Sequence, residues 1–109
     1  MTKLILFDID GTLVLTGGAG LRAMTRAFDD VFGPGAAVNI PMGGRTDAWI
    51  VEQVSRQRGF SYNDNDLERF HDAYIAHLAR EVHAPGPRKG MMPGVRPLLD
   101  ALAPRDDVY

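Results

Sequence analysis

The chain has 109 residues, a length that suits one small domain, and its 45% hydrophobic and 24% charged content is ordinary for a globular protein, which argues against disorder. Its 14 acidic and 12 basic residues are scattered without a basic run and leave a net charge of -2, so nucleic acid is a poor candidate partner. The absence of cysteine excludes a disulfide framework and a thiolate zinc site, and it is compatible with a reducing cytoplasm.

The first predicted element is a strand. Residues 3–7 read Lys-Leu-Ile-Leu-Phe, an apolar run that Asp8 stops, and this pattern is typical of a strand buried on both faces of a parallel sheet. The run is much shorter than a signal-peptide core or the roughly 20 residues that span a bilayer. We therefore expect a cytoplasmic protein with no membrane partner.

Two helices are predicted next. Apolar residues at helical spacing indicate the first over about residues 20–32, and Gly33 and Pro34 then end it, because glycine accepts a left-handed backbone and proline cannot continue a helix. The second helix begins at Thr46, whose hydroxyl suits an N-cap, and it runs to Gly59.

The third predicted helix has the clearest pattern. It begins at a capping box formed by Asn65 and Glu68, and it ends before the break at Pro85. One apolar stripe is expected along it, formed by Leu67, Phe70, Tyr74, Ile75, Leu78 and Val82. The three helices can pack together as a small bundle. The three histidines on the last of them are six residues apart and point in different directions, so a histidine metal site is not expected.

A short helix over residues 94–103 is followed by Asp106 to Tyr109, which resembles the approach to a second strand. Parallel neighbours of a buried strand are reached through crossover units of about 30 residues, so the first strand lacks them here. We expect an α/β fold with core parts at residues 1–15 and 89–109 and a helical insert at residues 16–88. The core is expected to be incomplete in this chain.

The motif that carries chemistry is Asp8-Ile9-Asp10-Gly11-Thr12-Leu13, directly after the first strand. Two carboxylates at positions i and i+2 beyond a strand end can converge on one site, at the edge where parallel sheets bind ligands. Like charges held close together favour a proton on one of the two, so the pair divides into an acid and a nucleophile. Gly11 permits the sharp departure from the strand, and free N–H groups in the turn can meet phosphate oxygens.

Two structural interpretations compete with this one. The motif can be an acidic turn at the end of a strand, or the opening of a calcium loop. An EF-hand loop needs glycine at its sixth place and glutamate at its twelfth, and this chain has Leu13 and Ala19 there. The calcium loop therefore fails, and the acidic turn stays as the structural alternative.

The hexapeptide resembles the first signature, Asp-x-Asp-Gly-Thr, of the haloacid dehalogenase superfamily. The resemblance implies that Asp8 attacks a phosphoryl group to form an aspartyl phosphate, and that Asp10 acts as general acid and then as general base. It implies Mg²⁺ as the cofactor, held by the Asp8 carboxylate and the Asp10 backbone carbonyl. The dehalogenase branch lacks an acid at the Asp10 position, so a phosphatase or a phosphomutase is favoured. The implied fold is a Rossmann-like parallel sheet with a helical, C1-type cap.

Further substrate contacts follow from the same resemblance. Gly44-Arg45-Thr46-Asp47 is similar to the cap segment of phosphoglycolate phosphatase-like members, where Arg45 would suit a substrate carboxylate. The alternative is a solvated arginine beside a capping threonine. Gly11 and Thr12 are expected to bind substrate, and Thr16-Gly17-Gly18 is expected to be a hinge for the cap.

The sequence thus predicts a Mg²⁺-dependent phosphatase of a small phosphorylated metabolite, similar to phosphoglycolate phosphatase. We expect this chain to be its truncated N-terminal part, inactive by itself because the later signatures of the superfamily are not encoded here. The alternatives are a non-catalytic chain that retains the motif for binding or regulation, and a phosphomutase of the same superfamily. The oligomeric state is not predicted.

Overall fold

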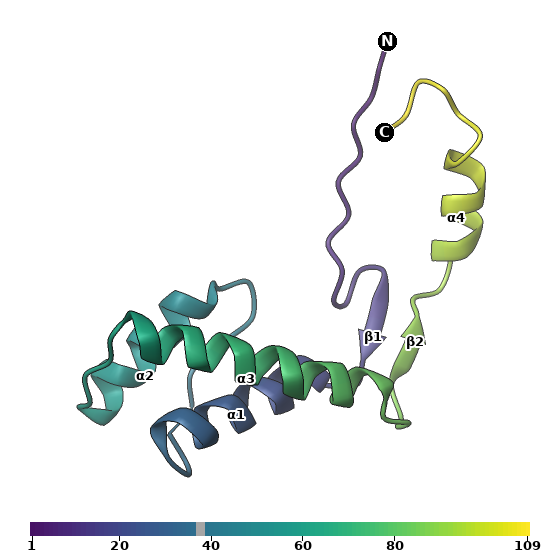
Figure 1. The fold of residues 1–109 in the computed structure, drawn as a ribbon. Helices are drawn as coiled ribbons and strands as arrows, with labels where there is room; N and C mark the ends of the chain where they lie inside the picture. The colour runs from purple at the N-terminus through teal and green to yellow at the C-terminus, as the bar shows by residue number, and fades with distance from the viewer. Residues whose placement is uncertain (37–38) are drawn as a thin grey trace. The chain divides into compact units, whose positions relative to one another are not determined.

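The computed structural model describes residues 1–36 and 39–109. In these residues the elements follow the chain as β1 (Val14–Thr16), α1 (Ala19–Phe32), α2 (Asp47–Arg58), α3 (Asp64–His83), β2 (Lys89–Met91) and α4 (Val95–Leu102) (Figure 1). The fold is therefore mixed α/β, with four helices and one two-stranded sheet in the described ranges. No helix of the described residues has the length and apolar character that a membrane crossing needs.

The chain divides into two compact units. The terminal unit consists of Met1–Gly18 and Pro85–Tyr109, and the helical unit consists of Ala19–Ala84. The insert was expected to span residues 16–88. Along the chain, the boundaries between the two units fall after Gly18 and after Ala84.

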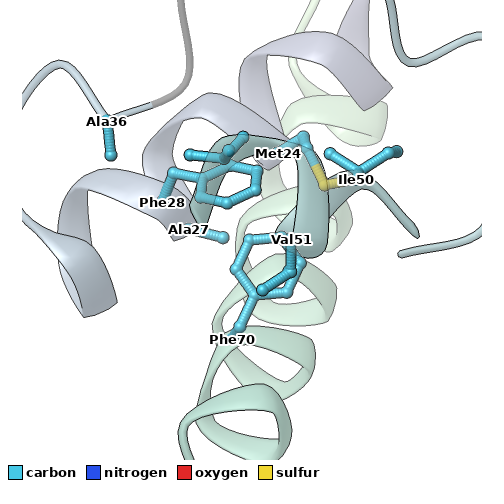
Figure 2. Packing of buried hydrophobic residues seen from close by; sticks show 8 residues of the cluster. Met24, Ala27, Phe28, Ala36, Ile50, Val51 and Phe70 are labelled. Atoms are coloured by element: carbon cyan, nitrogen blue, oxygen red, sulfur yellow. The ribbon is translucent and has the colours of Figure 1, made fainter. Parts of the chain in front are cut away.

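The core lies in the helical unit, where α1 packs along α3 and α2 adds a third wall. Figure 2 shows Phe28 of α1, Val51 of α2 and Phe70 of α3 converging, and all three are fully buried. The rings of Phe28 and Phe70 have centroids 4.5 Å apart in a tilted arrangement, which aromatic pairs favour. Each such side chain contributes roughly 1.5–3 kcal/mol by leaving water. The predicted small bundle is confirmed.

Polar groups also join α1 to α3. The buried Glu81 carboxylate accepts from Arg22 at 2.7 Å and lies 3.0 Å from a nitrogen of Arg26, so two guanidinium groups offset the cost of burying its charge. The Nε2 atom of His77 lies 2.6 Å from a carboxylate oxygen of Asp30. These pairs fix how the two helices face each other.

The predicted ends of the first two helices are confirmed. Gly33 follows α1 with a left-handed φ of 98°. The Thr46 hydroxyl accepts from the Trp49 N–H at 3.3 Å at the start of α2. Gly59 ends α2 with a φ of 73°, and its N–H donates to the Ser55 carbonyl.

The predicted start of the third helix is wrong by two residues. The capping box is formed by Asn63 and Asp66: the Asp66 N–H donates to the Asn63 side chain at 2.9 Å, and the Asn63 N–H donates to the Asp66 carboxylate at 3.2 Å. The expected stripe is only partly inside, since Phe70 is buried while Ile75 is 53% exposed and Val82 is 46% exposed. The face that packs on α1 continues toward Glu81, and Ile75 and Val82 lie beside it.

In the terminal unit, β1 and β2 pair antiparallel with the register Val14↔Met91, Leu15↔Gly90 and Thr16↔Lys89. This ribbon was not predicted, because its strands have three residues each and its nearest paired residues, Thr16 and Lys89, are 73 positions apart in the sequence. The short helix was predicted correctly, and α4 begins after Gly94, whose φ is 81°.

Residues 3–7 do not form the predicted first strand. The segment forms a single parallel bridge, between Lys3 and Val108. Three backbone bonds accompany it: Lys3 N–H to Asp107 at 2.7 Å, Ile5 N–H to Tyr109 at 2.7 Å, and Tyr109 N–H to Lys3 at 2.9 Å. The two chain ends lie side by side at this bridge (Figure 1).

The expected burial of this segment on both faces is also wrong. Leu4 is 71% exposed and Leu6 is 83% exposed, whereas Ile5 and Phe7 line a hollow of about 400 Å³ together with Leu99 and Leu102 of α4. A strand is buried only by the neighbours that cover it, and the terminal unit provides one paired segment and one helix. A parallel Rossmann-like sheet is not shown, since the two strands of the described residues are antiparallel.

Candidate functional site

The hexapeptide that begins at Asp8 folds as a tight turn. The Ile9 carbonyl accepts from the N–H groups of Thr12 at 3.3 Å, Leu13 at 2.9 Å and Val14 at 3.2 Å, and the Gly11 N–H donates to the Val14 carbonyl at 2.8 Å. Gly11 has a φ of 77°, in the left-handed region that glycine adopts without strain. The turn leads directly into β1.

Asp8 and Asp10 stand on either side of Ile9 in this turn, and both are exposed to solvent. The Thr16 hydroxyl donates to the Asp10 Oδ1 atom at 3.4 Å, a long and therefore weak hydrogen bond. Thr16 is held by its pairing with Lys89, so the β1–β2 ribbon positions the hydroxyl that donates to Asp10. Sequence reasoning assigned Thr16 only to a hinge, and no spacing rule connects it with Asp10.

Asp10 also lines a hollow of about 680 Å³ within the terminal unit, and its other lining residues are Leu15, Thr16, Gly17, Gly18, Pro87 and Arg88. This volume lies within the range of small-molecule sites. Asp8 is not among the lining residues. The structure thus places one carboxylate in the hollow and the other on the adjacent turn.

Free N–H groups in the turn were expected to meet phosphate oxygens. The N–H groups of Gly11 and Thr12 donate to the Val14 and Ile9 carbonyls, so these two are not free, and the substrate contacts expected of both residues stay a prediction. Space remains at the turn, because a Cβ atom at Gly11 would meet no atom within 4 Å. A ligand can therefore approach the Gly11 backbone closely.

Arg45 belongs to the helical unit, whereas the aspartates belong to the terminal unit. Its guanidinium carbon lies 4.7 Å from the ring centroid of Trp49, in cation–π geometry. Thr46 caps α2, as both interpretations of this segment required.

A Mg²⁺ ion needs several oxygen ligands in near-octahedral geometry, often one or two carboxylates with substrate and water. In residues 1–36 and 39–109 the structure holds no group of three or more histidine, aspartate or glutamate side chains that could bind a metal. The two predicted donors, the Asp8 carboxylate and the Asp10 carbonyl, do not form a metal site by themselves. A Mg²⁺ ion at this turn would take its remaining ligands from substrate and water.

Comparison with known proteins adds no relative. No protein-family model, curated protein or solved structure matches the chain. A function is therefore inferred from the turn and the hollow.

Proposed function

We propose that this chain carries the nucleophile and the acid–base residue of a phosphoric monoester hydrolase that acts on a small phosphorylated metabolite. The observation that carries the proposal is the place of Asp10: it lines a metabolite-sized hollow and belongs to the same turn as the exposed Asp8. Nucleophile and acid–base group must be close together and independently accessible, and this turn provides both conditions.

In the first half of the proposed reaction, a carboxylate oxygen of Asp8 attacks phosphorus. The bond between phosphorus and the ester oxygen breaks, and the electron pair stays on that oxygen. Asp10 gives its proton to the departing oxygen, so the alcohol leaves neutral and Asp8 becomes an aspartyl phosphate. General acid catalysis of this kind typically contributes about 10²–10⁴-fold.

In the second half, water attacks phosphorus and the Asp8–phosphoryl bond breaks. Asp10, now ionised, takes a proton from the water and returns to its starting state. The Thr16 hydroxyl donates to Oδ1 of Asp10, which leaves Oδ2 as the oxygen that carries the proton in both halves. Phosphate is released, and the free Asp8 carboxylate is regenerated.

The proposal extends to the fold and the cofactor that the resemblance implies. The pairing of Lys3 with Val108 supports residues 3–7 and 106–109 as neighbours in a parallel sheet. The exposed Leu4 and Leu6 support a second layer over this pair. Mg²⁺ and the substrate contacts of Gly11, Thr12 and Arg45 belong to the same proposal.

Phosphoryl labelling tests the nucleophile without turnover. The chain is incubated with acetyl phosphate and Mg²⁺, and intact-mass and peptide mass measurements locate any added phosphoryl group. We expect one group on Asp8 and none in Asp8→Asn, because the amide is a far poorer nucleophile. The label on Asp8 should persist, since this chain is expected to lack turnover by itself.

The matched control is Asp100→Asn, since Asp100 is an exposed carboxylate on α4. It should label as the wild type does. Labelling that persists in Asp8→Asn, or a wild-type chain that takes up no phosphoryl group, would contradict the proposal and favour a non-catalytic chain.

A further inference from the structure

Arg88 has an unusual backbone conformation. Its φ is 57°, and Asn39 is the other non-glycine residue with a left-handed φ in the described ranges. A left-handed backbone crowds the Cβ atom of any residue other than glycine, and asparagine tolerates it better than arginine because its short polar side chain can hydrogen-bond to the local backbone. Strain of this kind is held by the surrounding structure, and it clusters at active sites and ligand-binding sites.

Arg88 lines the same hollow as Asp10. In the part of the chain that the structure describes, no carboxylate pairs with it. Lys89 adds a second positive charge nearby, because its side chain lies against Gly17, another lining residue. Asp10 and Arg88 are thus the charged residues among those that line the hollow, and Lys89 lies close to them.

We infer that Arg88 binds a second anionic group of the substrate, in the half that leaves as the alcohol. This inference rests on the proposed role of Asp10: if Asp10 protonates the departing oxygen, the hollow beside it receives the leaving group. A guanidinium group binds carboxylate or phosphate through charge-assisted, often bidentate, hydrogen bonds. The substrate class is therefore a phosphate monoester whose alcohol carries a carboxylate or a further phosphate.

Arg88 and Asp10 belong to the same unit, so the structure places these two residues relative to each other. Arg45 lies on the ring of Trp49 in the helical unit, whereas Arg88 shares a hollow with Asp10 inside the terminal unit. Gly17 lets two segments that line the hollow approach each other closely, since a Cβ atom there would lie 2.8 Å from the Pro87 carbonyl oxygen.

The experiment is a ligand titration of the full chain, followed by the backbone amide signals of Thr16, Gly17 and Gly18 in NMR spectra. Glycolate represents a carboxylated leaving group, inorganic phosphate a phosphorylated one, and ethylene glycol a neutral one. We expect saturable shifts with one of the two anions and none with ethylene glycol. A response to glycolate identifies the second anion as a carboxylate, and a response to phosphate identifies it as a phosphoryl group.

The decisive variant is Arg88→Asn, which removes the charge and suits the left-handed backbone. Anion affinity should fall about tenfold or more, the effect of losing a charge-assisted hydrogen bond. The melting temperature should stay the same or rise, whereas a purely structural arginine would lower it. Arg88→Gly provides a second variant with a compatible backbone, and Arg96→Gln on α4 is the control that should bind as the wild type does.

Equal anion affinity in wild type and Arg88→Asn would overturn the inference, and so would the absence of any shift. The two proposals fail separately. Arg88-dependent shifts without labelling of Asp8 would support the anion site and contradict the hydrolase. Labelling of Asp8 without such shifts would support the hydrolase and contradict the anion site.

Discussion

At the scale of single residues, a hydrogen-bonded pair makes the stability of the helical unit depend on pH. The Tyr62 hydroxyl donates to Glu52 at 2.8 Å, and Arg56 donates to the other oxygen of Glu52 at 2.7 Å. The bond from Tyr62, followed by that from Arg56, lowers the pKa of Glu52 below 4.5. The same bond to Glu52 raises the pKa of Tyr62 above 10.0.

The two shifts act at opposite ends of the pH range. A lowered carboxyl pKa stabilises the fold above pH 4.5, and this contribution is lost as the pH falls through the folded-state value. A raised tyrosine pKa stabilises the fold below pH 10.0, and this contribution is lost as the pH rises through the folded-state value. Between these limits both contributions are present.

We predict that Tyr62→Phe flattens the pH dependence of stability at both ends. The free energy of unfolding, measured with urea from pH 3 to 11 (roughly the range that these groups titrate over), should fall less below pH 4.5 and less above pH 10.0 than in the wild type. Tyr109→Phe, in the other unit, is the control and should keep the wild-type curve for the helical unit. Parallel curves for Tyr62→Phe and the wild type would contradict the prediction.

How much of the site the sequence predicts depends on how local each residue's role is. Asp8, Asp10 and Gly11 belong to one hexapeptide, so their spacing alone identifies them. Thr16 and Arg88 act near Asp10 because β1 pairs with β2, and no pattern in two three-residue strands predicts that pairing. The residues that position and line the hollow were missed for this reason.

At the scale of elements, helix ends were predictable where one side chain decides them. Thr46, Gly33 and Gly59 work through bonds or φ angles within a few positions of themselves. The third helix shows the limit, because Asn63 with Asp66 and Asn65 with Glu68 both match a capping pattern. The longer glutamate is the commoner partner, but the shorter Asp66 makes the bond here.

We predict that the two asparagines differ when each is replaced by alanine. Asn63→Ala should lower the free energy of unfolding by about 1 kcal/mol, because the Asp66 N–H loses its acceptor. Asn65→Ala is the matched control: Asn65 lies inside the first turn of α3, and alanine has the higher helix propensity. Urea unfolding of both variants checks this. A larger loss in Asn65→Ala would place the cap two residues later.

Strands were predicted less well than helices, since a strand depends on partners far along the chain. The apolar run at residues 3–7 has the composition of a buried strand, yet its neighbour at residues 107–109 pairs with it at a single bridge. The pattern therefore reports what the segment could bury, and the pairing decides what is buried.

At the scale of the whole molecule, the two units differ in how they bury apolar side chains. The helical unit holds seven of the eight members of the main core cluster on its helices, namely Met24, Ala27, Phe28, Ile50, Val51, Val54 and Phe70, with Ala36 between α1 and α2. The terminal unit leaves Leu4 and Leu6 mostly exposed. The free energy of folding is therefore concentrated in the helical unit.

We predict that the segment of residues 19–84 folds by itself, because its core and the Glu81 ion pairs all lie within it. Trp49, the single tryptophan, packs against this core and reports its unfolding by fluorescence. The free energy of unfolding of the segment should lie within about 1 kcal/mol of that of the full chain, as expected for independent regions.

In the full chain, Leu6→Ser should leave the Trp49 transition unchanged, whereas Ile50→Ala should lower the free energy of unfolding by about 2–5 kcal/mol. A non-cooperative transition of the segment would contradict the prediction and show that the terminal unit stabilises the helices.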